Sequence, residues 1–256
     1  MHSTRIFSVI MLILFVGISC LAGEDTLTQV STIDALMSGI YDGPTTLAEL
    51  REKGDFGLGT FQTLNGEMIL LDGVFYQVTS SGEVLRPEKN TMTPFAVVTY
   101  FKADRTYKLQ KGTTFQDFSK ESESHFPSRN SFYAVKITGV FDMVKTRSVP
   151  AQKKPYPPLT EIVKNQPVFA MQQISGTMVG FWCPSFVKGV NVPGYHVHFL
   201  SADTRRGGHV LDFIARDATV EIDDTREFFL MLPDDDVFNK ANLEPDRSQD
   251  LKAVEK

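Results

Sequence analysis

This sequence of 256 residues has few cysteines and no excess of basic charge. It has 26 Lys and Arg against 31 Asp and Glu, a net charge of -5, and two cysteines. The charges are spread along the chain without a basic stripe, so there is no electrostatic case for binding nucleic acid or an anionic membrane surface. After residue 22, no apolar run approaches the ~20 residues needed to span a bilayer. These absences favour a globular protein with a small-molecule partner.

The first 22 residues differ from the rest and predict a signal peptide. Arg5 supplies a positive start, Ile6 to Ile18 is almost wholly apolar, and Cys20 to Ala22 offers small residues where a signal peptidase cuts. We therefore expect an exported protein, secreted or periplasmic. Lipid attachment at Cys20 is the alternative, although Gly17 stands where such a motif prefers Leu. Cleavage leaves Cys183 alone, which excludes an internal disulfide.

The mature chain is long enough for one large domain or two small ones. Residues 153–158 hold three prolines in four positions, which cannot enter a central strand and so predict a linker. We expect a mixed α/β domain over residues 23–152 and a β-rich, metal-binding domain with a charged tail over residues 159–256.

Short strands with few helices predict an α+β fold with mixed sheets. Thr46 and Glu49 form a capping box before a short helix that stops at Gly54. Asp72-Gly73 is a hairpin signal. Further short helices are expected at 33–37, 116–124 and 159–164, and strands at 56–62, 68–71, 74–78, 94–102, 131–143, 168–183, 194–202, 209–216, 218–222 and 227–232.

Three of the five histidines, His196, His198 and His209, lie within fourteen positions. Residues two apart on a strand share a face, so His196 and His198 project together. A four-residue turn at 203–206 would place His209 opposite Leu200 and diagonal to His198. Diagonal neighbours lie roughly 7 to 8 Å apart, close enough to share one ion. The spacing predicts a three-histidine metal site on a β-hairpin.

Three imidazoles with open positions are the ligands of a catalytic zinc site, because structural zinc has four protein ligands. Imidazole also suits iron, nickel, copper and cobalt, so zinc is favoured only by its redox inertness in an exported site. The alternative for a His-x-His pair alone is two polar residues on a wet strand face. His125, far from the cluster, is expected at the surface, and Trp182 and Cys183 in the core.

The sequence resembles the bacterial alpha-acetolactate decarboxylases over nearly the whole mature chain. The segments that carry the resemblance agree in order and spacing. They are residues 32–43, Gly54 to Phe61, Asn65 to Met68, Asp72-Gly73, Thr93 to Ala96, and the histidine block from Gly194 to His209.

The resemblance implies a two-domain α/β protein, often dimeric, in which the three histidines hold zinc. It also implies that Glu67, Arg147 and a C-terminal glutamate complete the site, with Glu255 as the candidate for the last. Thr60 is expected to line the pocket and, with Arg147, to bind substrate. From sequence alone, Arg147 is an ordinary surface arginine, Glu67 a charge at a hairpin edge, and Glu255 part of a tail.

The implied chemistry is consistent with these residue types. Decarboxylating a 2-hydroxy-3-keto acid leaves electron density on the former C2, which zinc chelated by the hydroxyl and keto oxygens can stabilise as an enediolate. Arg147 would orient the substrate carboxylate or the developing oxyanion. Glu67 would ligate zinc or deliver the proton that gives acetoin.

Two other functions fit parts of the pattern. A cupin-like metal oxygenase or isomerase also begins from His-x-His on a strand, but its usual glutamate ligand is missing, and Ala202 and Asp203 stand there instead. An exported metal-binding module without turnover would need only the histidine cluster.

Overall fold

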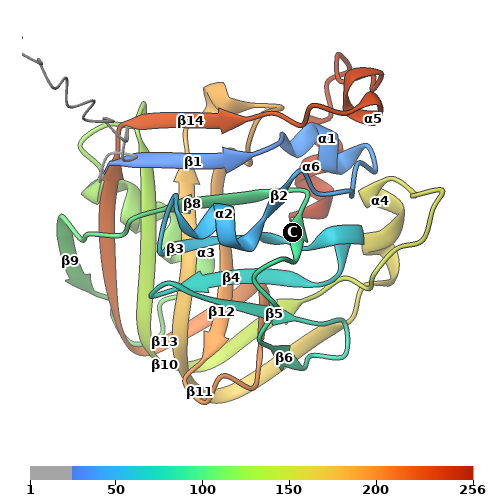
Figure 1. The fold of residues 1–256 in the computed structure, drawn as a ribbon. Helices are drawn as coiled ribbons and strands as arrows, with labels where there is room; N and C mark the ends of the chain where they lie inside the picture. The colour runs from blue at the N-terminus through green and yellow to red at the C-terminus, as the bar shows by residue number, and fades with distance from the viewer. Residues whose placement is uncertain (1–24, 256) are drawn as a thin grey trace, which may run out of the picture.

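The computed structural model describes residues 25–255, whose strands form two large sheets and one small one (Figure 1). The expected signal peptide lies outside the described residues. The first sheet has the order β14 (Glu227–Met231), β1 (Thr26–Val30), β8 (Ala96–Thr99), β3 (Phe56–Thr60), β4 (Glu67–Leu71), β5 (Val74–Val78) and β6 (Val84–Leu85). Strands β1 and β14 pair in parallel and the other neighbours antiparallel, so this sheet is mixed.

The second sheet is antiparallel throughout and has five strands. Its order is β10 (Phe132–Arg147), β11 (Val168–Cys183), β12 (Gly194–Ser201), β13 (Gly207–Thr225) and β9 (Arg105–Lys108). Strand β10 also pairs with β13, so β10, β11, β12 and β13 form a closed ring. A two-stranded sheet joins β2 (Thr45–Thr46) to β7 (Met92–Thr93).

The prediction of two strands at 209–216 and 218–222 is wrong, because β13 runs without a break. The register against β10 shifts here: Val140 faces Asp217, but Phe141 faces Ala215. Arg216 is therefore the extra residue of a bulge, and its side chain forms an ion pair with Asp142. The ladder accommodates the extra residue as a bulge, so the strand continues through it.

The helices are short, and several lie against the faces of the sheets (Figure 1). They are α1 (Ile33–Met37), α2 (Leu47–Arg51), α3 (Phe115–Ser122), α4 (Leu159–Ile162), α5 (Asp236–Asn239) and α6 (Ser248–Val254). The predicted capping box of α2 is confirmed, with Thr46 accepting from the Glu49 N–H and Glu49 from the Thr46 N–H. None of the helices in residues 25–255 is long and apolar enough to cross a membrane.

One core joins the two large sheets. Leu58 and Ile69 of the first sheet belong to the same buried cluster as Val179 and Phe181 of β11. The C-terminal helix α6 adds Leu251 and Val254 to this cluster. The tail predicted from its charge is thus anchored in the core, because two apolar side chains one turn apart lie on its buried face.

Residues 153–158 do not separate the two sheets. Strands β10 and β9 precede this segment and lie in the second sheet, whereas β14 follows it and lies in the first. The segment also contacts the rest of the chain, since Tyr41 donates to the carbonyl of Pro157 and Tyr156 donates to Asp42. The predicted linker therefore does not mark a boundary between the sheets.

Two strands that matter for the topology, β1 and β9, are not among the strands predicted from the sequence. All five residues of β1 are buried, so its sequence lacks the alternation of a half-buried strand. Strand β9 is a short edge of alternating exposure in a charged segment. His125, expected at the surface, is half-buried and stacks on Tyr107 with 3.9 Å between ring centroids.

The close approach of β3 to β8 requires glycine at residue 59. A Cβ on Gly59 would lie 2.3 Å from the carbonyl oxygen of Phe95. We expect Gly59→Ala to lower the free energy of unfolding by about 3 kcal/mol. Gly112→Ala, which meets no atom but adopts a positive φ, should cost about 1 kcal/mol. Urea unfolding measures both, and equal losses would contradict the proposed contact.

Candidate active site

Three histidines meet on the hairpin of β12 and β13. His198 lies directly opposite His209 in the ladder, and His196 is on the same face two residues earlier. The ring centroids are 5.0 to 5.4 Å apart. One ligand atom from each ring lies within 4.8 Å of the other two. The arrangement has the spacing of a metal-binding triad.

The expected register of this hairpin is wrong by two positions. Leu200 pairs with Gly207 rather than with His209, so the four-residue turn is 202–205. The Ser201 hydroxyl accepts the N–H groups of Arg205 and Arg206 and closes the turn one residue earlier than predicted. A shift of two positions keeps every side chain on its predicted face, so the three histidines still converge.

The surroundings of the imidazoles fit a metal ion. Nδ1 of His198 is 2.7 Å from the carbonyl oxygen of Met68 and donates to it, which leaves the lone pair on Nε2. That Nε2 and the Nδ1 of His196 are buried without a hydrogen-bond partner. Buried nitrogen atoms are costly without a partner, and a metal ion would provide one.

The histidines are neutral in this environment. Burial is the largest cause and lowers the pKa of His196 to about 3, and the Arg147 charge acts in the same direction. The pKa values of His198 and His209 are also lowered, again mainly by burial. Neutral imidazole is the form that ligates metals, so the site needs no proton loss before binding.

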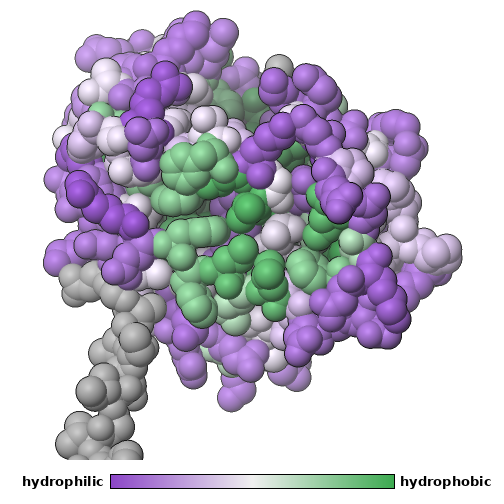
Figure 2. Space-filling view, turned by 90° about the horizontal axis from the view of Figure 1, so that it is seen from above, coloured by the Kyte–Doolittle hydropathy of each residue, from purple (hydrophilic) through white to green (hydrophobic). Residues whose placement is uncertain are grey.

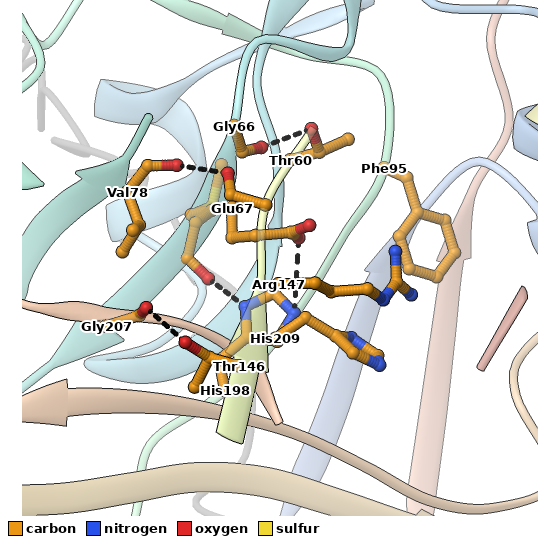
Figure 3. Close-up of polar contacts among 12 residues, drawn as sticks. Thr60, Gly66, Glu67, Val78, Phe95, Thr146, Arg147, His198, Gly207 and His209 are labelled. Atoms are coloured by element: carbon orange, nitrogen blue, oxygen red, sulfur yellow. Dashed lines mark hydrogen bonds and ion pairs between the residues drawn. The ribbon is translucent and has the colours of Figure 1, made fainter. Parts of the chain in front are cut away.

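Glu67 begins β4 directly after the positive-φ residue Gly66 and points toward the histidines (Figure 3). Its carboxylate lies 3.5 Å from Nε2 of His198. Burial raises the pKa of Glu67 to about 7, with Glu255 raising it and Arg147 lowering it. The hairpin-edge position suggested by sequence is thus buried, because β12 crosses over the start of β4.

Arg147 ends β10 opposite His209 and is 4% exposed. Nη1 donates to the side-chain oxygen of Gln166 over 2.9 Å, whereas Nε has no hydrogen-bond partner. The surface position expected from sequence is wrong, because the closed second sheet buries this strand end. Gln166 was missed: it precedes β11 in a polar loop, where no pattern distinguishes it.

Glu255 follows α6 and reaches both Arg147 and His209. Its carboxylate oxygens lie 3.8 Å from Nη2 of Arg147 and 3.6 Å from Nε2 of His209. Burial raises the pKa of Glu255 to about 7, and Arg147 lowers it. The packing of Leu251 and Val254 in the core holds the end of the chain at this point.

One small pocket is lined by five of these side chains: Glu67, Arg147, His196, His209 and Glu255. Thr60 also lines this pocket, and its hydroxyl donates to the carbonyl of Gly66. Phe95 lies beside the Arg147 side chain (Figure 3). The remaining wall is mostly apolar and was not predicted as part of the site, because its members look like ordinary core residues in the sequence: Ile33, Leu36, Leu64, Phe95, Val149 and Leu159. Trp182 and Cys183 are buried in the core, as expected.

Comparison with known proteins identifies the family. The model of the alpha-acetolactate decarboxylase family matches residues 27–245. The chain belongs to this family. It is thereby a member of a family of carboxy-lyases, which favours an enzyme over a binding module without turnover. The match ends before α6 and therefore does not include Glu255.

Relatives named alpha-acetolactate decarboxylase resemble the chain over most of its length. The Methanosarcina mazei protein is 47% identical over 91% of this chain and 81% of its own. The Bacillus subtilis strain 168 protein is 43% identical, with 89% of each chain covered. The crystal structure of the latter superposes with a TM-score of 0.88 over 90% of this chain and 99% of that one. This family member thus shares the fold described above.

The buried glutamates should make the stability of the metal-free chain depend on pH. Because the pKa of Glu67 rises on folding, its contribution is fully present below about pH 4.5 and is lost as the pH rises through about 7. Between pH 5 and 8, the wild type should lose about 2 kcal/mol more than Glu67→Gln. Urea unfolding in chelator tests this, and parallel pH curves would contradict it.

Proposed function

We propose that the chain decarboxylates 2-acetolactate to acetoin and CO2, with zinc as its metal. The observation that carries the proposal is the convergence of three neutral histidines, a buried arginine with a free Nε and two buried carboxyl groups around one pocket, which His196 and His209 line. Each group has a task in removing CO2 from a 2-hydroxy-3-keto acid. The family of the chain supports the same reaction.

His196, His198 and His209 would hold the metal. Three histidine ligands leave positions open for the substrate, as in catalytic zinc sites. When bound, zinc supplies Lewis-acid stabilisation of negative charge on the hydroxyl and keto oxygens of the substrate. Met68 contributes by fixing the tautomer of His198 through its carbonyl.

Arg147 recognises the negative charge of the substrate. Gln166 holds Nη1 by a hydrogen bond. Because the Gln166 side chain is neutral, it does not neutralise the positive charge of the guanidinium. Nε, which has no partner, and Nη2, whose nearest carboxylate oxygen is 3.8 Å away, can donate to an anionic oxygen. That oxygen belongs to the substrate carboxylate or to the oxyanion that develops as CO2 departs.

A proton must reach the former C2. Breaking the C1–C2 bond releases CO2 and leaves its electron pair as an enediolate across C2 and C3, and protonation of C2 gives acetoin. Glu67 and Glu255 both hold protons near neutral pH, because burial raises the pKa of each to about 7. Either is a suitable donor, and the apolar wall limits competing protonation by water.

The test is turnover of racemic acetolactate by the purified chain, with acetoin and CO2 measured after chelation and after zinc is added back. We expect chelation to abolish turnover and zinc to restore it. His198→Ala should lose bound metal and activity while its circular dichroism stays native. His125→Ala, outside the site, is the matched control. An inactive metal-loaded wild type, or a His198→Ala chain that keeps zinc and turnover, would contradict the proposal.

We also propose a homodimer in which a second copy covers the face around β14. Among the described residues no strand pairs with the outer edge of β14. Figure 2 looks down on this side and shows apolar residues gathered at its centre within a hydrophilic border. Phe186 is 63% exposed and contacts Phe132, which stacks on Phe228 of β14. An exposed apolar patch beside a free strand edge favours self-association.

Light scattering of the wild type and of Phe186→Asp tests the dimer. A charge placed in the patch should convert a dimer to a monomer without unfolding it, since Phe186 is mostly exposed. Val74→Asp is the control, because Val74 is an exposed apolar residue on β5, away from this edge. A monomeric wild type, or a Phe186→Asp variant that stays dimeric, would contradict the proposed interface.

Export also stays a proposal that rests on the sequence. The charged start, apolar run and small residues of positions 1–22 support secretion or periplasmic delivery, with lipid attachment at Cys20 as the alternative. The division into residues 23–152 and 159–256 stays a prediction of the same kind.

A further inference from the structure

The polar groups of the candidate site differ in exposure in a way that shows where it meets solvent. The side chains of His198 and His209 are 1% and 3% exposed, and those of Arg147 and Glu67 are 5% and 9% exposed. Glu255, at 14%, is the most exposed of the five. Solvent therefore reaches these groups most readily at the C-terminal end of α6.

A second cavity lies on the other side of Glu255. It has a volume of about 220 Å³, and Glu255 lines both this cavity and the histidine pocket. Its floor is apolar, with Val192, Pro193 and Leu251, and its remaining lining is Ser185, Lys188, Ser248 and Lys252. The two cavities therefore meet at one shared side chain, that of Glu255.

The charges around this cavity favour an anion. Lys188 forms an ion pair with Asp246 over 2.6 Å, so its charge is largely compensated. Lys252 is exposed, and no ion pair to it is found in residues 25–255. It lies one helical turn before Glu255 and lines the same cavity. Lys252 at this cavity and Arg147 in the histidine pocket would together attract an anionic ligand toward Arg147.

We propose that this second cavity, the vestibule, is the entrance through which a small carboxylate substrate reaches the histidine pocket, with Lys252 as the residue that attracts it. Glu255 stands at the junction of the two cavities, and the substrate passes it to reach Arg147. The inference rests on the proposed function, which makes the substrate a 2-hydroxy-3-keto carboxylate. The apolar floor accepts its methyl groups while the serine hydroxyls solvate its oxygens.

Charge reversal tests the attraction in the zinc-loaded full chain with acetolactate as the probe. Lys252→Glu should lower kcat/KM about fivefold at low ionic strength, and the difference should shrink toward zero near 1 M salt, where screening acts within about 3 Å. Lys240→Glu makes the same change in net charge at the C-cap of α5, outside the vestibule lining, and should stay within about 1.5-fold of wild type. Equal effects of the two variants at every salt concentration would overturn the role of Lys252.

Filling the vestibule tests the route. Ser248→Trp places a large side chain in the cavity, whereas Gln249→Trp places it at the exposed neighbouring position of the same helix. We expect a loss of tenfold or more in kcat/KM for the first variant and about twofold or less for the second, with zinc content equal in both. Equal kcat/KM values would overturn the route while wild-type turnover still supports the proposed function. An inactive wild type would contradict both the route and the proposed function.

Discussion

One row of paired residues across the second sheet supports the whole candidate site. Val168 of β11 faces Arg147 of β10, Arg147 faces His209 of β13, and His209 faces His198 of β12. His198 in turn faces Val179, back on β11, because the four strands close into a ring. Directly opposed residues share a face, so the row aims a guanidinium and two imidazoles at one point. A slip of one residue in any of these ladders would turn a member of the row away.

The first sheet completes what this row begins. It contributes the Met68 carbonyl that orients His198 and the Glu67 carboxylate that approaches it. Because both large sheets share one apolar core, the groups that they contribute are fixed relative to each other by packing. The site thus lies where the polar row of the second sheet meets the start of β4 in the first sheet. Burial at this place lowers the pKa of the imidazoles, which stay neutral, and raises the pKa of the carboxyl groups, which stay protonated to higher pH.

The C-terminal helix links the core, the site and solvent. Leu251 and Val254 anchor it, Glu255 extends from its end into the site, and Lys252 faces the vestibule. A helix of seven residues is marginal by itself, so its position depends on this packing. Helix α6 therefore has one face that anchors it in the core and one that carries charge. The proposed entrance runs along the charged face.

Local features of the fold could be predicted from the residues alone. The capping box at Thr46, most strand positions and the shared face of His196 and His198 follow from spacing and residue type, which act over a few residues. The resemblance of motifs added Glu67, Arg147 and Glu255 as candidates. Three features required the tertiary structure: the burial of Arg147, its hydrogen bond to Gln166 and the pairing of β1 with β14. They depend on strands that are far apart in the sequence or on side chains without a local pattern. The register of the histidine hairpin could be predicted only in part. The predicted turn was one residue too late, but side chains alternate between faces every two residues along a strand, so the histidines still share one face.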